Sequence, residues 1–64
     1  MKLFQITYMQ DSDTASYLTI GGPDDTEVTI RDRELAKMED KGCLYIFYAT
    51  EIKEVDGHEI TVVA

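Results

Sequence analysis

The strongest constraint on the fold is an uninterrupted apolar run at residues 43–49, which reads Cys-Leu-Tyr-Ile-Phe-Tyr-Ala. Aromatic and β-branched side chains favour strands, so we expect a long strand over residues 43–54. Successive side chains of a strand point to opposite faces, and both faces of this one are apolar. Such a strand is typical of a sheet that is covered on both sides. Because the chain has only 64 residues, it has little material to build two covers.

Two further strands are expected before this run. Residues 3–9 alternate between apolar and polar side chains, which places Phe4, Ile6 and Tyr8 on one face of a strand. Residues 16–20 also predict a strand, and the polar residues between the two indicate a turn. The first third of the chain therefore predicts two strands joined by a turn.

Residues 31–41 are predicted to form the one helix, because they contain good helix formers and neither Gly nor Pro. Thr29 is the expected N-cap of this helix, and Gly42 is its expected left-handed terminator. Residues 26–30 alternate between apolar and polar side chains, so a short strand there is an alternative interpretation. We favour the interpretation in which these residues lead into the helix.

The dipeptide Asp56-Gly57 predicts a β-hairpin near the end of the sequence. A three-residue loop over residues 55–57 would place the glycine at a bulge that needs a positive φ, and it would pair Glu54 with His58. A two-residue loop would instead pair the apolar Ile60 with the charged Lys53. We therefore favour the three-residue loop.

Together these elements predict a small α+β fold in the order β-β-α-β-β. We expect residues 1–64 to form a single domain, with a four-stranded, mainly antiparallel sheet and one helix packed on one face. The alternative strand at residues 26–30 would be a fifth, short one.

One helix of this length can cover only one face of the sheet. Its apolar stripe is thin and consists of Ile30, Leu35 and Met38. We expect the other face to be exposed and to carry Tyr45 and Phe47, with Tyr17 beside them. Exposed aromatic side chains commonly mark protein interfaces, so these three residues are a candidate binding face.

The chain carries 13 acidic and six basic residues, which gives a formal net charge of −7. The predicted helix is neutral, so the excess of negative charge lies in the loops and the final hairpin. Direct nucleic-acid binding is excluded, because it depends on positive charge that neutralises phosphates. The acidic surface instead favours a basic protein partner, such as a nucleic-acid-binding protein. The residues expected to form this surface are Asp24, Asp25, Glu51, Glu54, Asp56 and Glu59.

Residues that commonly carry catalysis are scarce. Cys43 is the one cysteine and His58 the one histidine, and the predicted hairpin places them far apart. The aspartates at residues 11–13 and 24–25 lack the spacing of a calcium-binding loop, and turn formation explains them. The sequence therefore predicts no catalytic residue, no metal site, no cofactor and no enzymatic activity. A small-ligand binder is an alternative that would require a concave pocket with convergent polar groups.

The sequence also indicates a location for the protein. Its longest apolar run is far shorter than the ~20 residues of a membrane span, so we expect no membrane partner. The first residues lack the pattern of a signal peptide, and a lone cysteine is typical of a reducing compartment. We expect a cytoplasmic protein, in its own cell or in a host cell.

Small size, acidity and the lack of active-site residues favour a non-enzymatic protein-binding module. Its sharpest version is an inhibitor of a nucleic-acid-binding enzyme, of the type that a phage or mobile element uses against host defence, with an acidic surface that mimics the phosphate backbone. The main alternative is a self-associating structural or accessory protein that forms a homodimer through the aromatic sheet face.

Overall fold

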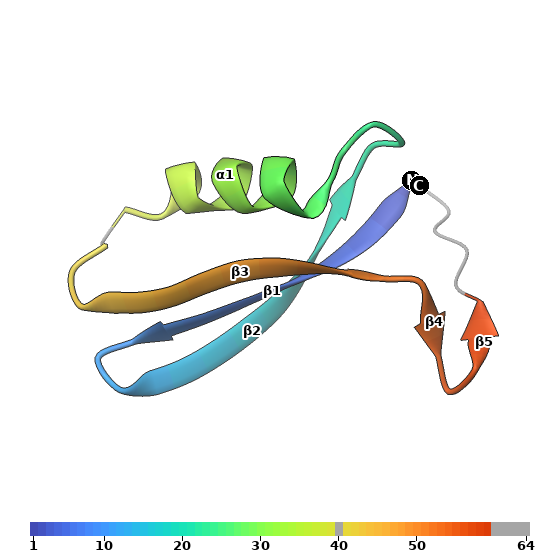
Figure 1. The fold of residues 1–64 in the computed structure, drawn as a ribbon. Helices are drawn as coiled ribbons and strands as arrows, with labels where there is room; N and C mark the ends of the chain where they lie inside the picture. The colour runs from blue at the N-terminus through green and yellow to red at the C-terminus, as the bar shows by residue number, and fades with distance from the viewer. Residues whose placement is uncertain (40, 60–64) are drawn as a thin grey trace.

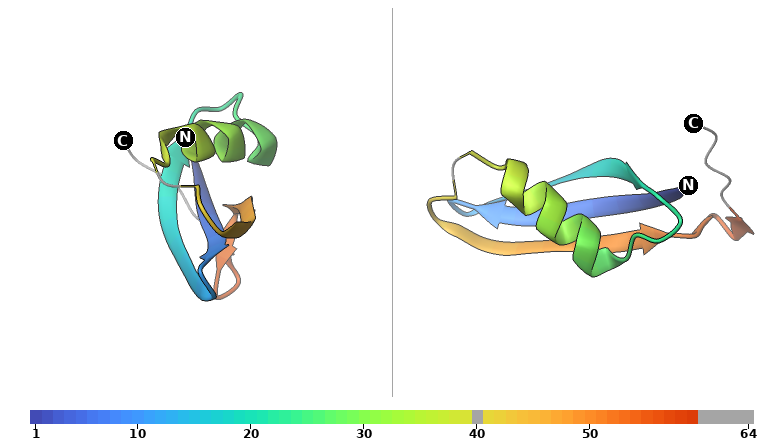
Figure 2. Two further views of the ribbon diagram at one scale, coloured as in Figure 1. Left: turned by 90° about the vertical axis from the view of Figure 1, so that its left-hand side faces the viewer. Right: turned by 90° about the horizontal axis from the view of Figure 1, so that it is seen from above.

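A computed structural model describes residues 1–39 and 41–59 of the chain (Figure 1). The elements in chain order are β1 (Lys2–Gln10), β2 (Asp13–Gly21), α1 (Glu27–Lys37), β3 (Leu44–Ile52), β4 (Glu54–Val55) and β5 (His58–Glu59). The first three strands form an antiparallel sheet in the order β2-β1-β3, and β4 and β5 form a separate two-stranded hairpin. Helix α1 lies across one face of the three-stranded sheet (Figure 2).

The predicted α+β class, with one helix on one face of an antiparallel sheet, is confirmed. The predicted four-stranded sheet is not what the described residues form, because their main sheet has three strands and the final hairpin stands apart from it (Figure 1). Residues 60–64, which the prediction placed in the last strand, lie outside the described residues.

Strands β1 and β2 are longer than predicted because the turn between them has only two residues. Asp11 and Ser12 have φ values of 51° and 69°, and Gln10 pairs directly with Asp13 on either side of them. Two consecutive residues with positive φ match the right-handed twist of the flanking strands, as in a type I′ hairpin. The two nine-residue strands therefore stay paired over their whole length.

The core lies between the central strand and the helix. Among the described residues, Phe4 and Ile6 of β1 and Ile30 of α1 are fully buried, and Ala49 of β3 is 8% exposed. Tyr8 and Phe47 are partly buried against this cluster. The alternation predicted for the first strand, with Phe4, Ile6 and Tyr8 on one face, is confirmed.

The helix begins four residues earlier than predicted. Thr26 is the N-cap, since its side chain accepts a hydrogen bond of 3.2 Å from the Thr29 backbone N–H, and the Thr29 hydroxyl accepts one of 2.8 Å from the Thr26 N–H. These reciprocal bonds form a capping box in which threonine replaces the usual Glu or Gln. The prediction of Thr29 as N-cap is therefore wrong, and the alternative of a strand over residues 26–30 is excluded because residues 27–30 are helical.

The connection from the helix to β3 also differs from the prediction. The helix ends at Lys37, with Met38 as its C-cap. The left-handed backbone expected at Gly42 is found instead at Cys43, whose φ is 57°. Cys43 is exposed and precedes the strand instead of opening it.

The final hairpin has a two-residue turn, so the predicted three-residue loop is wrong. Asp56 and Gly57 have φ values of 53° and 78°, and Val55 pairs with His58 across them. The preceding strand ends at Ile52, and the hairpin starts two residues later. Glycine and aspartate both tolerate positive φ, which is the requirement of a type I′ turn.

The close contact of Gly21 with the core gives a test of the fold. A Cβ at this position would lie 2.8 Å from both Ile30 Cδ1 and Phe4 Cε2. Because such overpacking forces neighbouring groups to shift, we expect Gly21→Ala to lower the free energy of unfolding by about 1–3 kcal/mol in urea titrations followed by circular dichroism. Gly22→Ala is the matched control, since the nearest atom there, Asp25 Oδ2, is 3.6 Å away. An equal loss in the two variants would contradict this packing.

Candidate functional site

The buried residues show which face of the sheet the helix covers. Phe4, Ile6 and Ala49 point toward α1 and are buried beneath it. In an antiparallel sheet, directly paired residues have their side chains on the same face. The partners of Ile6 are Tyr17 on β2 and Ala49 on β3. The alternate residues of all three strands therefore belong to the opposite face.

That opposite face carries four side chains from each of three strands, twelve in all, and we call it the uncharged face. Its four rows across the sheet are Ile20–Leu3–Ile52, Leu18–Gln5–Thr50, Ser16–Thr7–Tyr48 and Thr14–Met9–Ile46. Charged residues make up 30% of the chain, so an even distribution would place about four of them among these twelve. The face has none, which sets it apart from the rest of the molecule.

Most of the uncharged face is also apolar and open to solvent. Leu18 is 59% exposed, Tyr48 47%, Ile20 43% and Ile46 42%. Leu3, Met9 and Ile52 complete the apolar set and are half-buried. No element of the described chain packs on this face (Figure 1). Exposed apolar surface that is continuous over three strands is typical of an interaction surface.

The sheet face that was expected to be open and aromatic is the one that the helix covers, although Tyr17 remains 40% exposed. Phe47 packs beside Tyr8 under the helix, with ring centroids 5.9 Å apart, and Tyr17 donates a hydrogen bond of 3.0 Å to Glu34 of the helix. Tyr45 is 71% exposed, but it lies at a bulge in the pairing with β1, outside the uncharged face. Both faces of β3 are apolar, so its own sequence could not decide which one the helix covers.

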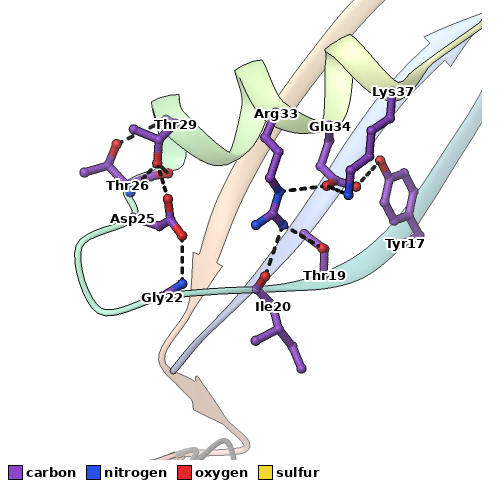
Figure 3. Close-up of polar contacts among 10 residues, drawn as sticks. All are labelled: Tyr17, Thr19, Ile20, Gly22, Asp25, Thr26, Thr29, Arg33, Glu34 and Lys37. Atoms are coloured by element: carbon purple, nitrogen blue, oxygen red, sulfur yellow. Dashed lines mark hydrogen bonds and ion pairs between the residues drawn. The ribbon is translucent and has the colours of Figure 1, made fainter. Parts of the chain in front are cut away.

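A polar cluster fixes the helix to the edge strand β2 (Figure 3). Glu34 is only 6% exposed, and its carboxylate accepts hydrogen bonds of 3.0 Å from Tyr17 Oη, Arg33 Nε and Lys37 Nζ. Three donors satisfy the buried carboxylate, which would otherwise be costly to remove from water. The cluster therefore holds the helix over one face and leaves the other open.

Arg33 extends the same attachment along β2. Its Nη2 donates to Thr19 Oγ1 at 3.0 Å and to the Ile20 carbonyl oxygen at 3.1 Å (Figure 3). Glu34 was not among the residues predicted to face the core. The available signal was its spacing, because Glu34 follows the buried Ile30 by four residues and so lies on the same face of the helix.

The cluster changes the pKa values of two of its members. Burial opposes ionisation of Glu34, but hydrogen bonds from Lys37, Tyr17 and Arg33 outweigh it and hold the pKa of this carboxyl below its usual range. Burial raises the pKa of Tyr17 to about 12, and the hydrogen bond to the Glu34 carboxylate and its negative charge add to the effect. Glu34 thus stays ionised and Tyr17 stays protonated at neutral pH.

The predicted acidic residues gather at one end of the molecule, where β1 begins and β3 ends. The loop before α1 carries Asp24 and Asp25, and it lies at the same end as the β4–β5 hairpin (Figure 1). The acidic residues at the end of β3 and on this hairpin are Glu51, Glu54, Asp56 and Glu59. Lys2 Nζ donates to the Asp25 carbonyl oxygen at 3.0 Å, which joins the loop to the start of β1.

Asp25 has a structural role within this acidic end. Its carboxylate accepts a 2.7 Å hydrogen bond from the Gly22 N–H and a 3.0 Å bond from the Thr29 hydroxyl. These bonds, led by the one from Gly22, lower the pKa of Asp25. The charge of Asp25 is thus used to close the loop between β2 and α1.

An open groove of about 370 Å³ lies at the acidic end. Its lining residues are Met1, Lys2, Leu3, Glu51, Ile52, Lys53, Glu54 and Glu59.

The described residues contain no group of three His, Cys, Asp or Glu side chains that could hold a metal ion. Cys43 and His58 lie beyond opposite ends of β3. In the described part of the chain, no helix has both the length and the apolar character needed to cross a membrane.

Comparison with protein-family models, with curated proteins and with solved structures finds no match to this chain. The uncharged face is therefore identified from the geometry of the chain itself.

The buried cluster predicts a pH dependence at high pH. The unfolded chain releases the Tyr17 proton near pH 10, whereas the folded chain holds it to about pH 12. The contribution of this proton to the free energy of unfolding is fully present below pH 10 and is lost as the pH rises from about 10 to about 12. We expect Glu34→Gln to move the pKa of Tyr17 back toward 10 in an absorbance titration of tyrosinate. Asp32→Asn, which removes one exposed negative charge from the same helix, should leave the titration unchanged.

Proposed function

We propose that this chain is a non-enzymatic protein-binding module and that the uncharged face is its binding surface. The observation that carries the proposal is the face itself, with twelve adjacent side chains, seven of them large and apolar, and no charge. The described residues bury four hydrophobic side chains, so the open face holds more large apolar groups than the core.

The chemistry of the face defines the partner that fits it. Burial of a large aliphatic side chain contributes about 1.5–3 kcal/mol, and the face offers several that are about half exposed. No charged group has to be desolvated on this side, so the usual cost of burying an ion is absent. The hydroxyl groups of Thr7, Ser16 and Thr50 can exchange hydrogen bonds with a partner. A flat protein surface that is itself uncharged and apolar meets these conditions.

A second candidate function comes from the acidic end. The loop with Asp24 and Asp25 lies at the same end of the molecule as the acidic hairpin, which the sequence alone did not require (Figure 1). This arrangement supports a role as an inhibitor that binds the basic surface of a nucleic-acid-binding enzyme, with the acidic end mimicking the phosphate backbone. Charge attraction weakens with salt, whereas apolar burial does not, so salt separates the two functions.

The protein-binding proposal is tested with three immobilised baits in lysate of the source cells. Tyr48 and Tyr45 are both exposed tyrosines of β3, but only Tyr48 belongs to the uncharged face. We expect wild type and Tyr45→Lys to retain a common protein that Tyr48→Lys loses, because a lysine on the face would have to be desolvated on binding. Quantitative mass spectrometry identifies the protein, and calorimetry with the purified partner measures the affinity.

Capture that is equal on the three baits would contradict a role for the uncharged face. Capture that is lost from all three in about 0.5 M NaCl would instead support binding through the acidic end. Glu54→Gln with Glu59→Gln is the variant for that second function, and it should weaken only the salt-sensitive capture.

A further inference from the structure

We propose that the partner seated on the uncharged face is a second copy of this chain. This inference rests on the protein-binding function proposed above and names its occupant. The two sheets would pack face to face, about 10 Å apart, with a helix on each outer side. The twelve residues of each face would then lie in the centre of a four-layer assembly.

A second copy has the chemistry that the face requires. Contacts across a two-fold axis join the same patch of both subunits, so the patch must be self-complementary. The uncharged face meets this condition, because it brings no charge against another charge and no unpaired ion into the interface. On the helix side of the molecule, by contrast, charged groups such as Arg31, Asp32 and Lys37 are exposed.

The size of the face agrees with a weak dimer. Three strands spaced about 4.8 Å apart, with nine residues each at about 3.3 Å, give a footprint of roughly 14 by 30 Å. Two such footprints amount to about 800 Å² before the relief of the side chains is counted. Specific interfaces bury about 1,200–2,000 Å², and weak or transient ones lie below that range. The dissociation constant of the dimer should therefore lie in the micromolar to millimolar range, and its subunits should exchange rapidly with free monomer.

The small core gives an independent reason for self-association. Among the described residues the core consists of Phe4, Ile6, Ile30 and Ala49, with partial cover from neighbouring rings. Chains of this size commonly need a disulfide, a metal or an oligomer to reach ordinary stability. The chain has one cysteine, and the described residues form no metal cluster. A face-to-face dimer would supply the missing burial, so folding stability should rise with protein concentration.

Charge determines how this dimer responds to salt. Each chain carries a formal charge of −7, and all of it lies off the uncharged face. Two copies therefore repel each other through solvent while their contact surfaces are neutral. Raising NaCl from about 0.05 M to about 0.5 M shortens the screening length and relieves this repulsion. Salt should strengthen the dimer, which is the opposite of its effect on the acidic end.

The test is analytical ultracentrifugation of the full chain from about 10 µM to about 1 mM at both salt concentrations. We expect the average molecular mass to rise with protein concentration from 7.3 kDa toward twice that value. In high salt this rise should begin at a lower protein concentration than in low salt. Tyr48→Lys should weaken dimerisation at least tenfold. Tyr45→Lys, with the same change of residue and charge, should dimerise like the wild type. Circular dichroism establishes that both variants are folded.

A measurement on the wild type alone covers the case in which Tyr48→Lys fails to fold. Amide chemical shifts followed by NMR on dilution should change at the uncharged face and stay constant in α1.

A wild type that is monomeric to about 1 mM in both salts overturns the inference that the partner is a second copy. If the three-bait experiment still shows capture that depends on Tyr48, the protein-binding function stands without it. A dimer that tolerates Tyr48→Lys, or shifts confined to α1, also overturns the inference.

Discussion

The packing of Ile30 against Phe4 and Ile6 is the contact on which the rest of the structure depends. It places the helix over the central strand, and the hydrogen bonds that Glu34 accepts from Tyr17 and that Arg33 donates to Thr19 then fix the helix against β2. Together these contacts bury Phe4, Ile6 and Ala49 on one face of the sheet. The other face receives no cover from the described chain, although it is as apolar as the first. A two-layer fold from a sequence with two apolar sheet faces therefore leaves one apolar face open as a direct consequence of its construction.

The elements that local patterns specify could be predicted from the sequence. Alternation in β1 places Phe4 and Ile6 in the core, and the long apolar run predicts β3. The boundaries of α1 could not be predicted as well, because Thr26 and Thr29 form a capping box that differs from the usual pattern. In the described residues, both turns that join paired strands have two residues with positive φ. The dipeptide Asp11-Ser12 gives little sign of a positive φ, whereas Asp56-Gly57 clearly indicates a turn but does not fix the length of its loop.

The uncharged face was the part that local pattern could not resolve. A strand such as β3, with Phe47 on one side and Tyr48 on the other, is symmetric in hydrophobicity. The choice between its faces is made by long-range register, in which β1 presents Phe4 and Ile6 to the helix and leaves Leu3 and Met9 opposite. The acidic end is a second such case. Its residues come from two distant segments, and only the antiparallel pairing of β2 and β3 with β1 brings them together.

The absence of charge from one face has a consequence for the behaviour of the protein in solution. Charged side chains on a sheet act as gatekeepers, since they oppose sheet-to-sheet stacking of partly assembled chains. Here the carboxylates around the rim are the main source of that protection. Their effect depends on ionisation, and the isoelectric point lies near pH 4.3. As the pH falls toward this value the net charge of the monomer approaches zero while the uncharged face is unchanged, so acidification favours precipitation.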